Sequence, residues 1–325
     1  MSRKALMIGI DDYEGCKLSA CVNDAKALGE ALEYNYDDTK NFDVSFLLDA
    51  EATRARVRKS IKNLFKGNDD IALLYFSGHG IDDENDGFIV THDFAQDDWG
   101  ISMPEILKFV NKSKCKNKIV IFDCCYSGFA GTSGFIGDES ILSTGTIILT
   151  ASRSNETSAI RRTDTNSLFT KLFLEALNGA GSDIFGHTTP SSIYSFIDRA
   201  LGSWEQRPVF KSNVDSFISL KENKQKISMT KLKRNLKLFR KADDLYQLDP
   251  SYEPTNYEGS IDRHLKPYRT EEHVKIFKEL LELFRVGIIE PVDKENMYEA
   301  AMNSKTCRLT SLGRYYHTLM KEKKI

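Results

Sequence analysis

Short apolar runs alternate with helical patterns along the first 220 residues. Six runs predict buried strands, over residues 5–10, 44–48, 71–76, 119–122, 147–150 and 208–211. Between them, apolar residues recur at three- and four-residue spacing and predict helices over residues 20–33, 53–65, 103–110 and 168–177. This alternation is typical of an α/β fold in which helices cover both faces of a largely parallel sheet.

The pattern changes after residue 220. Residues 221–241 carry nine Lys or Arg against the single acid Glu222, and apolar residues at helical spacing predict a basic amphipathic linker helix in the second half. Residues 242–325 predict a separate small domain with a helix over 273–284, an extended piece over 287–291 and a closing helix after 308–310. We therefore expect three parts, 1–220, 221–241 and 242–325.

Composition narrows the class of protein. A chain of 325 residues with 41% apolar content can bury a full core, and its net charge of -2 gives no overall attraction to nucleic acid or to acidic membranes. The apolar runs are too short for a membrane helix, and the N-terminus lacks the apolar region of a secretory signal. Six cysteines without a repeated spacing indicate reduced thiols. We expect a cytoplasmic protein.

Two predicted strands end in reactive side chains. One is followed by Ser77-Gly78-His79-Gly80 and the other by Asp123-Cys124-Cys125-Tyr126-Ser127-Gly128. Because the carboxyl ends of parallel strands share one edge of a sheet, an imidazole and a thiol should meet there. A histidine can activate a neighbouring cysteine as a nucleophile, so this pair predicts a protease dyad.

These motifs carry a family resemblance over about residues 1–220. Together with Cys21-Val22-Asn23-Asp24-Ala25, they resemble the caspase-like cysteine peptidases of the peptidase C14 family, most closely the metacaspase branch. Three further segments also look like that family, in its order: Thr150-Ala151-Ser152, Leu168-Phe169-Thr170 and Gln206-Arg207-Pro208. The resemblance implies an α/β/α sandwich around a mostly parallel six-stranded sheet, and the pattern after residue 241 predicts a small, mainly helical C-terminal domain beside it.

The resemblance also implies catalytic roles. Cys125 would be the nucleophile, and His79 would activate it and protonate the leaving amine. The backbone N–H groups of Gly80 and Cys125 would hold the oxyanion. Cys124 would lie on the opposite face of its strand, where we expect a small buried apolar residue.

Substrate choice follows from four positions that match the family's pocket for the residue before the scissile bond. Asp24 and Asp123 are its two carboxylates, and Cys21 and Ser77 line it. Two carboxylates call for a cation, which predicts cleavage after Arg or Lys. The alternatives are structural, with Asp24 a local cap or ion-pair partner and Asp123 a turn former.

Thiol chemistry of this kind requires no cofactor, but the resemblance suggests calcium as an activator. Its candidate ligands are Asp93, Asp97 and Asp98, with a second acidic cluster at Asp82, Asp83, Glu84 and Asp86. Neither cluster has a calcium-loop signature, so a solvated acidic loop is the alternative. No spacing of His and Cys indicates zinc.

Two features bear on processing. No basic residue lies between Lys118 and Arg153, so an Arg- or Lys-selective enzyme has no site for cutting itself there and should work as a single chain. The basic segment 221–241 offers many such sites. Release of the C-terminal domain by self-cleavage is therefore a hypothesis.

The C-terminal domain weakly resembles a winged helix through Leu309-Thr310-Ser311-Leu312-Gly313-Arg314. Its 13 basic and 15 acidic residues over 242–325 argue against a DNA reader. We expect a protein-interaction or sensor module that could receive an activating partner, although the basic helix before it keeps DNA binding open.

The prediction for the whole chain is a monomeric, regulated bacterial cysteine endopeptidase that cuts proteins after Arg or Lys, in stress, cell-death or defence signalling. The alternative is a catalytically silent caspase-like scaffold whose C-terminal domain binds DNA or a protein partner.

Overall fold

The computed structural model describes residues 2–83, 86–95, 98–125, 142–151, 165–201, 208–216, 218–259 and 265–325, apart from the side chains of residues 82, 83 and 125. Contacts between residues divide the chain into two compact units, Met1–Lys224 and Gln225–Ile325. Each unit is described by itself. In the described part of the chain, no helix combines the length and the apolar character needed to span a lipid bilayer.

The N-terminal unit is built on one large sheet. Its main strands are β1 (Arg3–Gly9), β2 (Asp43–Leu48), β3 (Ile71–Asp83), β6 (Asn117–Cys125), β7 (Thr146–Thr150) and β9 (Val209–Asn213), in the spatial order β2-β1-β3-β6-β7-β9. All neighbouring pairs are parallel except β7 and β9. The predicted mostly parallel six-stranded sheet is confirmed.

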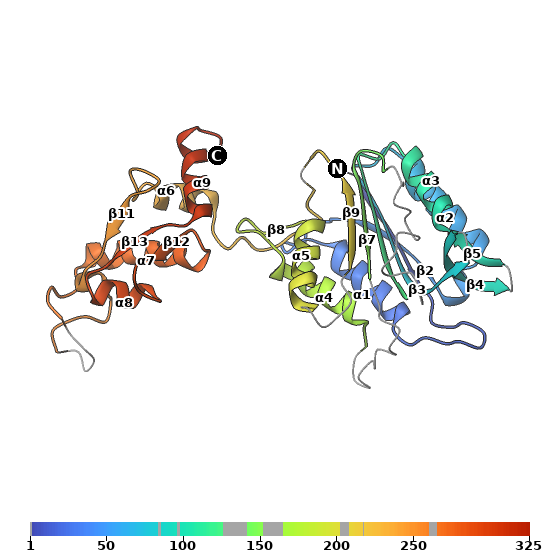
Figure 1. The fold of residues 1–325 in the computed structure, drawn as a ribbon, viewed down its shortest axis with the longest axis horizontal. Helices are drawn as coiled ribbons and strands as arrows, with labels where there is room; N and C mark the ends of the chain where they lie inside the picture. Colours follow the sequence, from blue (N-terminus) through green and yellow to red (C-terminus); the bar gives the residue numbers. More distant parts are fainter. Residues whose placement is uncertain are drawn as a thin grey trace. The chain divides into compact units, whose positions relative to one another are not determined.

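Helices cover both faces of this sheet (Figure 1). Helices α2 (Arg54–Lys66) and α3 (Met103–Lys112) lie on one face, and α1 (Cys21–Glu33), α4 (Leu168–Glu175) and α5 (Pro190–Leu201) lie on the other. Alternate strand residues supply the two cores: Leu6 and Ile8 face α2, whereas Ala5 and Met7 face α1. The sandwich is thus a direct result of strands that are apolar on both sides.

The first turns of the helices show why they begin where they do. Asp11 caps α1, with its carboxylate accepting from the N–H groups of Cys21 at 2.8 Å and Val22 at 3.1 Å. Helix α3 begins with half of a capping box, because the Ser102 hydroxyl accepts from the Glu105 N–H while the Glu105 carboxylate pairs with Arg58.

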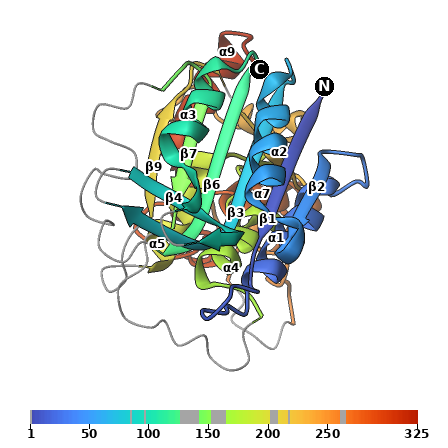
Figure 2. The ribbon, with the colours of Figure 1, turned by 90° about the vertical axis from the view of Figure 1, so that its right-hand side faces the viewer.

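The structure adds elements that the pattern does not predict. Strand β3 runs past residue 76 and turns into an antiparallel sheet with β4 (Asp86–Ala95), which pairs in turn with β5 (Asp98–Ser102). Figure 2 shows these short strands below α3. Helix α4 ends at Glu175 and passes into a short irregular helix, η2 (Ala176–Ala180), with Gly179 at a φ of 121°.

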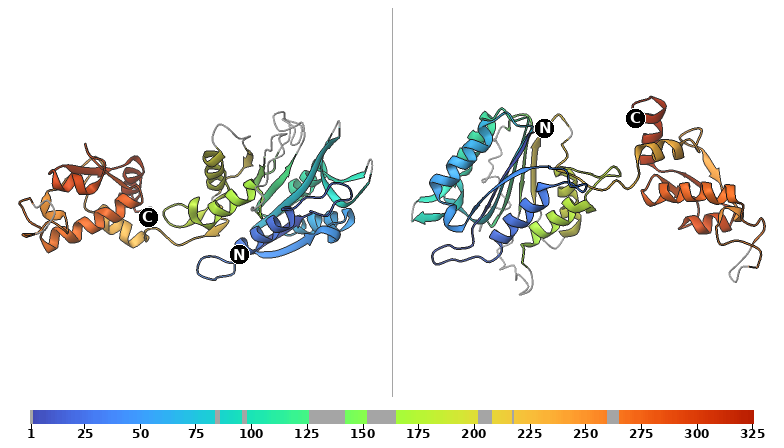
Figure 3. Two further views of the ribbon diagram at one scale, coloured as in Figure 1. Left: turned by 90° about the horizontal axis from the view of Figure 1, so that it is seen from below. Right: turned by 180° about the vertical axis from the view of Figure 1, so that it is seen from behind.

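The C-terminal unit packs helices on a short antiparallel sheet, with its elements drawn in orange and red in Figure 3. The sheet has the order β11 (Leu245–Gln247), β13 (Thr306–Leu309), β12 (Ile289–Pro291). Helices α6 (Met229–Leu236), α7 (Glu271–Arg285), α8 (Met297–Met302) and α9 (Ser311–Lys321) complete it, with a 3-10 turn, η3 (Pro250–Tyr252). Helix α8 lies between β12 and β13 in the chain, and the winged-helix likeness stays a prediction.

The basic segment 221–241 is divided between the two units, whereas the sequence predicts one linker helix. Its first residues form β10 (Lys221–Glu222), which pairs with β8 (His187–Thr188) of the N-terminal unit. Helix α6 belongs to the C-terminal unit, where Lys231 and Arg234 pair with Glu282 and Glu279 of α7. The amphipathic pattern of α6 is therefore satisfied within its own unit, with Leu232 and Leu236 buried.

Candidate functional site

The two reactive motifs meet at the carboxyl edge of the sheet. Strands β3 and β6 are parallel neighbours, and His79 is the register partner of Cys125, with Ser77 opposite Asp123. Gly80 follows on β3 and pairs with Ile89. The backbone therefore places the imidazole and thiol positions side by side, and Cys124 lies buried in the core, as predicted.

His79 is held by the loop before α1. Its Nε2 lies 2.7 Å from the carbonyl oxygen of Cys16, and its ring packs on the ring of Tyr13 with centroids 4.7 Å apart. The hydroxyl of Tyr13 accepts from the His79 N–H at 3.1 Å and donates to the Val90 carbonyl at 3.1 Å. Tyr13 is fully buried, and burial raises the pKa of its phenol, so it stays a neutral anchor.

The contact with Cys16 fixes the tautomer of the imidazole. A carbonyl oxygen only accepts, so Nε2 must carry a proton for this hydrogen bond to form. In the neutral ring, Nδ1 is then the nitrogen that accepts a proton. A backbone oxygen thus orients His79, in the role that a carboxylate has in other catalytic triads.

The four predicted substrate-binding residues form one buried polar cluster. Asp24, Ser77 and Asp123 are fully buried, and Cys21 is 4% exposed. The Ser77 hydroxyl donates to Asp24 Oδ2 at 3.3 Å. Helix α1 can approach the strand ends closely because Gly9 of β1 has no side chain, and a Cβ there would lie 2.9 Å from that of Ala25.

Residues just before and inside α4 join the two carboxylates. The Ser167 N–H donates to Asp24 Oδ1 at 3.0 Å, and its hydroxyl donates to Asp123 Oδ2. Asn166 Nδ2 also donates to Asp24 Oδ1, at 2.8 Å. Ser167 is at the same time the N-cap of α4, accepting from the Thr170 N–H at 3.0 Å. One serine thus links both acidic side chains to a helix terminus.

Asp123 receives a second hydroxyl donor on the same oxygen that accepts from Ser167. Thr170 Oγ1 donates to Asp123 Oδ2 at 2.8 Å, and the Tyr75 hydroxyl lies 2.6 Å from Thr170 Oγ1. Because the threonine gives its only hydroxyl proton to the carboxylate, Tyr75 is the donor to Thr170. Burial and the nearby Asp123 raise the pKa of Tyr75, which keeps that proton in place.

The cluster explains why Asp24 and Asp123 are not ordinary surface carboxylates. Asp24 is not the helix cap, since Asp11 has that role, and neither side chain is exposed. Burying a carboxylate costs free energy, and the hydroxyl and amide donors described above offset part of that cost for Asp24 and Asp123. The arrangement can receive a positively charged group.

The cysteine side chains of the described residues differ in their exposure to solvent and in the pKa of their thiols. Cys16 is exposed, whereas Cys21, Cys115, Cys124 and Cys307 are buried. Burial raises the pKa of Cys21 above its usual range, with a hydrogen bond from Ser77 opposing the shift, and burial raises that of Cys307 to about 12. These two thiols therefore stay neutral at ordinary pH.

We expect iodoacetamide to label native Cys125→Ala protein at Cys16 and to leave Cys21 and Cys307 unmodified, because only a thiolate that solvent can reach is alkylated. Peptide mapping by mass spectrometry before and after unfolding measures this. Labelling of Cys21 as fast as Cys16 in the folded protein would contradict the buried cluster.

Two of the three predicted calcium ligands, Asp93 and Asp98, are engaged by Arg54. Asp93 Oδ1 accepts from the Arg54 N–H at 2.7 Å, and the Arg54 guanidinium pairs with Asp98. The Arg54 guanidinium thus supplies positive charge to Asp98, and its neutral backbone N–H occupies one oxygen of Asp93, while Asp97 lies outside the described residues. Over the described part of the chain, no group of three or more His, Cys, Asp or Glu is placed to hold a metal. Calcium binding stays a prediction.

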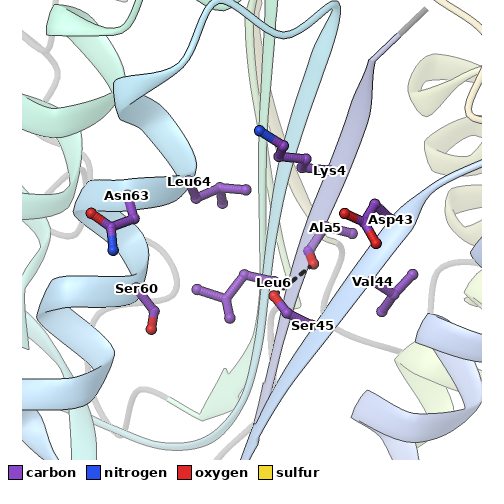
Figure 4. Close-up of a pocket in the computed structure, with 9 residues that line it drawn as sticks. All are labelled: Lys4, Ala5, Leu6, Asp43, Val44, Ser45, Ser60, Asn63 and Leu64. Atoms are coloured by element: carbon purple, nitrogen blue, oxygen red, sulfur yellow. Dashed lines mark hydrogen bonds between the residues drawn. The ribbon is translucent and has the colours of Figure 1, made fainter.

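A separate cavity lies away from the dyad. It has a volume of about 290 Å³ and is bordered by β1, β2 and α2, with Lys4, Asp43, Ser60 and Asn63 among its lining residues (Figure 4). These residues come from the amino-terminal half of the strands and the middle of α2. The cavity is therefore not the site that the motifs predict.

Sequence reasoning missed several residues that support the site. Tyr75, Asn166 and Ser167 carry no motif, although a serine directly before Leu168 is a helix-start signal that could have pointed to Ser167. The Cys16 carbonyl is a backbone group and leaves no trace in a sequence. Of the predicted motif residues, six lie outside the described residues, as does the side chain of Cys125; these six are Tyr126, Ser127, Gly128, Ser152, Gln206 and Arg207.

The comparison with protein families decides the assignment. The model of the caspase domain of the peptidase C14 family matches residues 2–218. The chain belongs to this family. A caspase domain is thus shown for the N-terminal unit, while the metacaspase branch stays a prediction. Family membership implies a cysteine peptidase that acts on protein substrates.

Solved structures and curated proteins were also compared. The caspase domain is similar to the protein GSU0716 from Geobacter sulfurreducens, at 19% identity and a TM-score of 0.48, over 69% of this chain and 98% of that one. It is similar to caspase-1 from Spodoptera frugiperda, at 14% identity and a TM-score of 0.45, over 68% of this chain and 90% of that one. No curated protein matches significantly.

Proposed function

We propose that the protein is a cysteine endopeptidase that uses Cys125 and His79 to cleave proteins after Arg or Lys. The observation that carries this proposal is the buried pair of carboxylates, Asp24 and Asp123, bridged by Ser167 beside the dyad. An acidic substrate side chain would be repelled there, whereas an ammonium or guanidinium group would offset two buried negative charges.

The reaction follows from the groups on the two strand ends. His79 Nδ1 takes the proton of the Cys125 thiol, and the thiolate attacks the carbonyl carbon of the substrate peptide bond. The N–H groups of Gly80 and Cys125 receive the oxyanion. His79 then protonates the leaving amine, and water hydrolyses the thioester with His79 as base, which restores the thiol and releases the acid product.

In this proposal, the substrate cation takes the place of one neutral donor, and the other donors stay. The amide of Asn166 now donates to Asp24, and a lysine or arginine can replace that neutral donor by a charged one. Ser167 and Thr170 keep Asp123 oriented while this exchange takes place. Orientation of a charged group by fixed dipoles favours the bound state, since little reorganisation is needed.

Replacing Ser167 by alanine is expected to lower kcat/KM for an Arg peptide by about tenfold, because a hydrogen bond to a charged group is worth about 1.5–3 kcal/mol. Ser167→Thr should restore most of the loss. The matched control is Ser228→Ala, which removes the N-cap of α6 and so costs similar helix stability. Equal effects of both alanine variants on kcat/KM would contradict a role in substrate binding.

The proposal extends to the localisation, oligomeric state and biological role of the enzyme and to the role of its C-terminal unit. We infer a cytoplasmic, monomeric enzyme of stress, cell-death or defence signalling, whose C-terminal unit is an interaction or sensor module. Leu312 and Tyr315 of α9 support the last point, since they are 44% and 59% exposed on one side of the helix. Calcium response and self-cleavage within 221–241 are tested by adding calcium or chelator and by the mass of the active chain.

The experiment that tests the function is hydrolysis of fluorogenic peptides by wild type and Cys125→Ala. Hydrolysis after Arg or Lys that disappears in the variant supports the endopeptidase. Hydrolysis after Asp would contradict the acidic pocket. The silent-scaffold alternative predicts no hydrolysis in any condition, whereas His79 held by Cys16 beside Cys125 supports turnover.

A further inference from the structure

Charge is distributed very unevenly over the N-terminal unit. Residues 1–224 carry 25 Lys or Arg and 32 Asp or Glu, a formal -7. Within this acidic unit, α2 and the stretch 103–116, which is α3 with the four residues after it, hold ten basic residues and one acid, a formal +9. The rest of the unit is therefore at -16. Such a separation of charge marks a surface that attracts anions.

We call these ten side chains the α2–α3 basic face. All ten are exposed. They come from two neighbouring helices that lie side by side on one side of the sheet in Figure 2, and Arg58 joins the helices by pairing with Glu105. The ten residues of the face are Arg54, Arg56, Arg58, Lys59, Lys62, Lys66, Lys108, Lys112, Lys114 and Lys116.

Part of the face is neutralised by the unit itself. Arg54, Arg56 and Arg58 pair with Asp98, Glu51 and Glu105, and Lys116 pairs with Asp70. For the other six, no acidic partner is found among the side chains that the structure describes; these are Lys59, Lys62, Lys66, Lys108, Lys112 and Lys114. The helix dipole favours Lys66 and Lys112 in the last turns, but it gives no reason for lysines in the middle of both helices.

The six lysines form two rows. Lys59, Lys62 and Lys66 recur at three- and four-residue spacing along α2, so the row is about 10 Å long at 1.5 Å per residue. Lys108 and Lys112 are four residues apart on α3, with Lys114 just beyond its end. Packed helices lie about 8–10 Å apart, which sets the separation of the rows.

The chemistry of the face selects its partner. Protein interfaces favour aromatic residues and arginine and are poor in lysine, so an acidic protein is a poor match. A membrane-bound helix needs exposed apolar side chains, and none of the large exposed apolar residues lies in α2 or α3. Lysine rows without exposed aromatic rings fit a phosphate backbone whose bases are paired and stacked.

We propose that the α2–α3 basic face binds the phosphate backbone of a double-stranded nucleic acid without regard to sequence. Ser60 and Asn63, on the same helix beside the cavity of Figure 4, add neutral donors of the kind that contact phosphate.

The α2–α3 basic face lies away from the residues that we propose for catalysis. Helices α2 and α3 end where β3 and β6 begin, whereas His79 and Cys125 lie at the carboxyl ends of those strands. A duplex bound along the lysine rows would therefore leave the dyad open to peptides. Nucleic acid would act as a scaffold that concentrates the protein and its substrates.

The test is fluorescence anisotropy of the full chain with a labelled duplex of about 30 base pairs at increasing salt. We expect binding whose log Kd changes with log salt by a slope of about 5 for six neutralised phosphates. The variant Lys62→Glu/Lys66→Glu/Lys112→Glu should weaken binding by about 30-fold or more and lower that slope by about 3. Duplex DNA and duplex RNA are compared to identify the source of the phosphates.

The matched control is Lys26→Glu/Lys275→Glu/Lys278→Glu, which makes the same change in net charge at exposed sites on α1 and α7. It should weaken binding less than about threefold. Circular dichroism checks that both variants are folded. Because anisotropy measures duplex binding directly, the test does not depend on peptidase activity. Equal loss in both variants, no duplex binding by wild type at low salt, or tighter binding of single strands or poly-L-glutamate overturns the proposal.

Discussion

Replacing His79 by alanine is expected to lower kcat for an Arg peptide by about 10³-fold, within the 10²–10⁴ range of general acid and base catalysis. Without the imidazole, the thiol loses the base that takes its proton and the leaving amine loses its proton donor. KM should change little, because the cation pocket is built from Asp24 and Asp123. Steady-state kinetics at constant pH measures both parameters.

Two variants make this test specific. Tyr13→Phe removes only the hydroxyl that accepts from the His79 N–H, so a loss of about tenfold is expected. His187→Ala removes an imidazole that pairs with Asp183 elsewhere in the unit and should leave kcat unchanged. A loss below tenfold for His79→Ala would place the catalytic base on another residue.

Neutralising the acidic pair is expected to have the second-largest effect. Asp123→Asn and Asp24→Asn should each lower kcat/KM for Arg and Lys peptides by about 10²-fold, since removing one partner of a buried charged pair costs about 2–5 kcal/mol. Asn retains the size of the side chain but loses the charge that a guanidinium needs. Kinetics with Arg, Lys and Asp peptides measures the effect.

Stability must be separated from binding in these variants. Asp123 accepts hydrogen bonds from Ser167 and Thr170, so Asp123→Asn should also lower the melting temperature. Asp43→Asn, on the exposed edge strand β2, controls for a general effect of charge and should change neither quantity. Unchanged kcat/KM in folded Asp24→Asn and Asp123→Asn would show that the cation is bound elsewhere.

Much of the fold could be predicted from apolar patterns. The central strands of the main sheet are continuous apolar runs because both of their faces are buried, and the helices α1, α2 and α3 are periodic because one face of each packs on a core. The hairpin of β4 and β5 was not predicted, because Asp86, Asp93 and Asp98 disfavour strands and the hairpin forms by pairing with the extension of β3. Helix α5 was missed although Pro190 stands at its first position, where proline favours a helix start.

In the candidate site, too, some features could be predicted from the sequence and others could not. Residues such as His79, Cys125 and Asp123 lie at strand ends, and parallel pairing places these strand ends side by side, so the proximity of the residues follows from the order of the motifs. The Cys16 carbonyl that orients His79 is a backbone atom in a loop, and its position depends on how residues 11–18 fold over the strand end. Ser167 links the carboxylates through long-range contacts that no local pattern encodes.

The most direct test of the account is the hydrolysis of three fluorogenic peptides that differ only in the residue before the scissile bond, Arg, Lys or Asp. Wild type and Cys125→Ala are compared, with calcium or chelator present. We predict cleavage of the Arg and Lys peptides by wild type, no cleavage of the Asp peptide, and none of any peptide by the variant. Cleavage of the Asp peptide, or activity that survives in Cys125→Ala, would contradict the account.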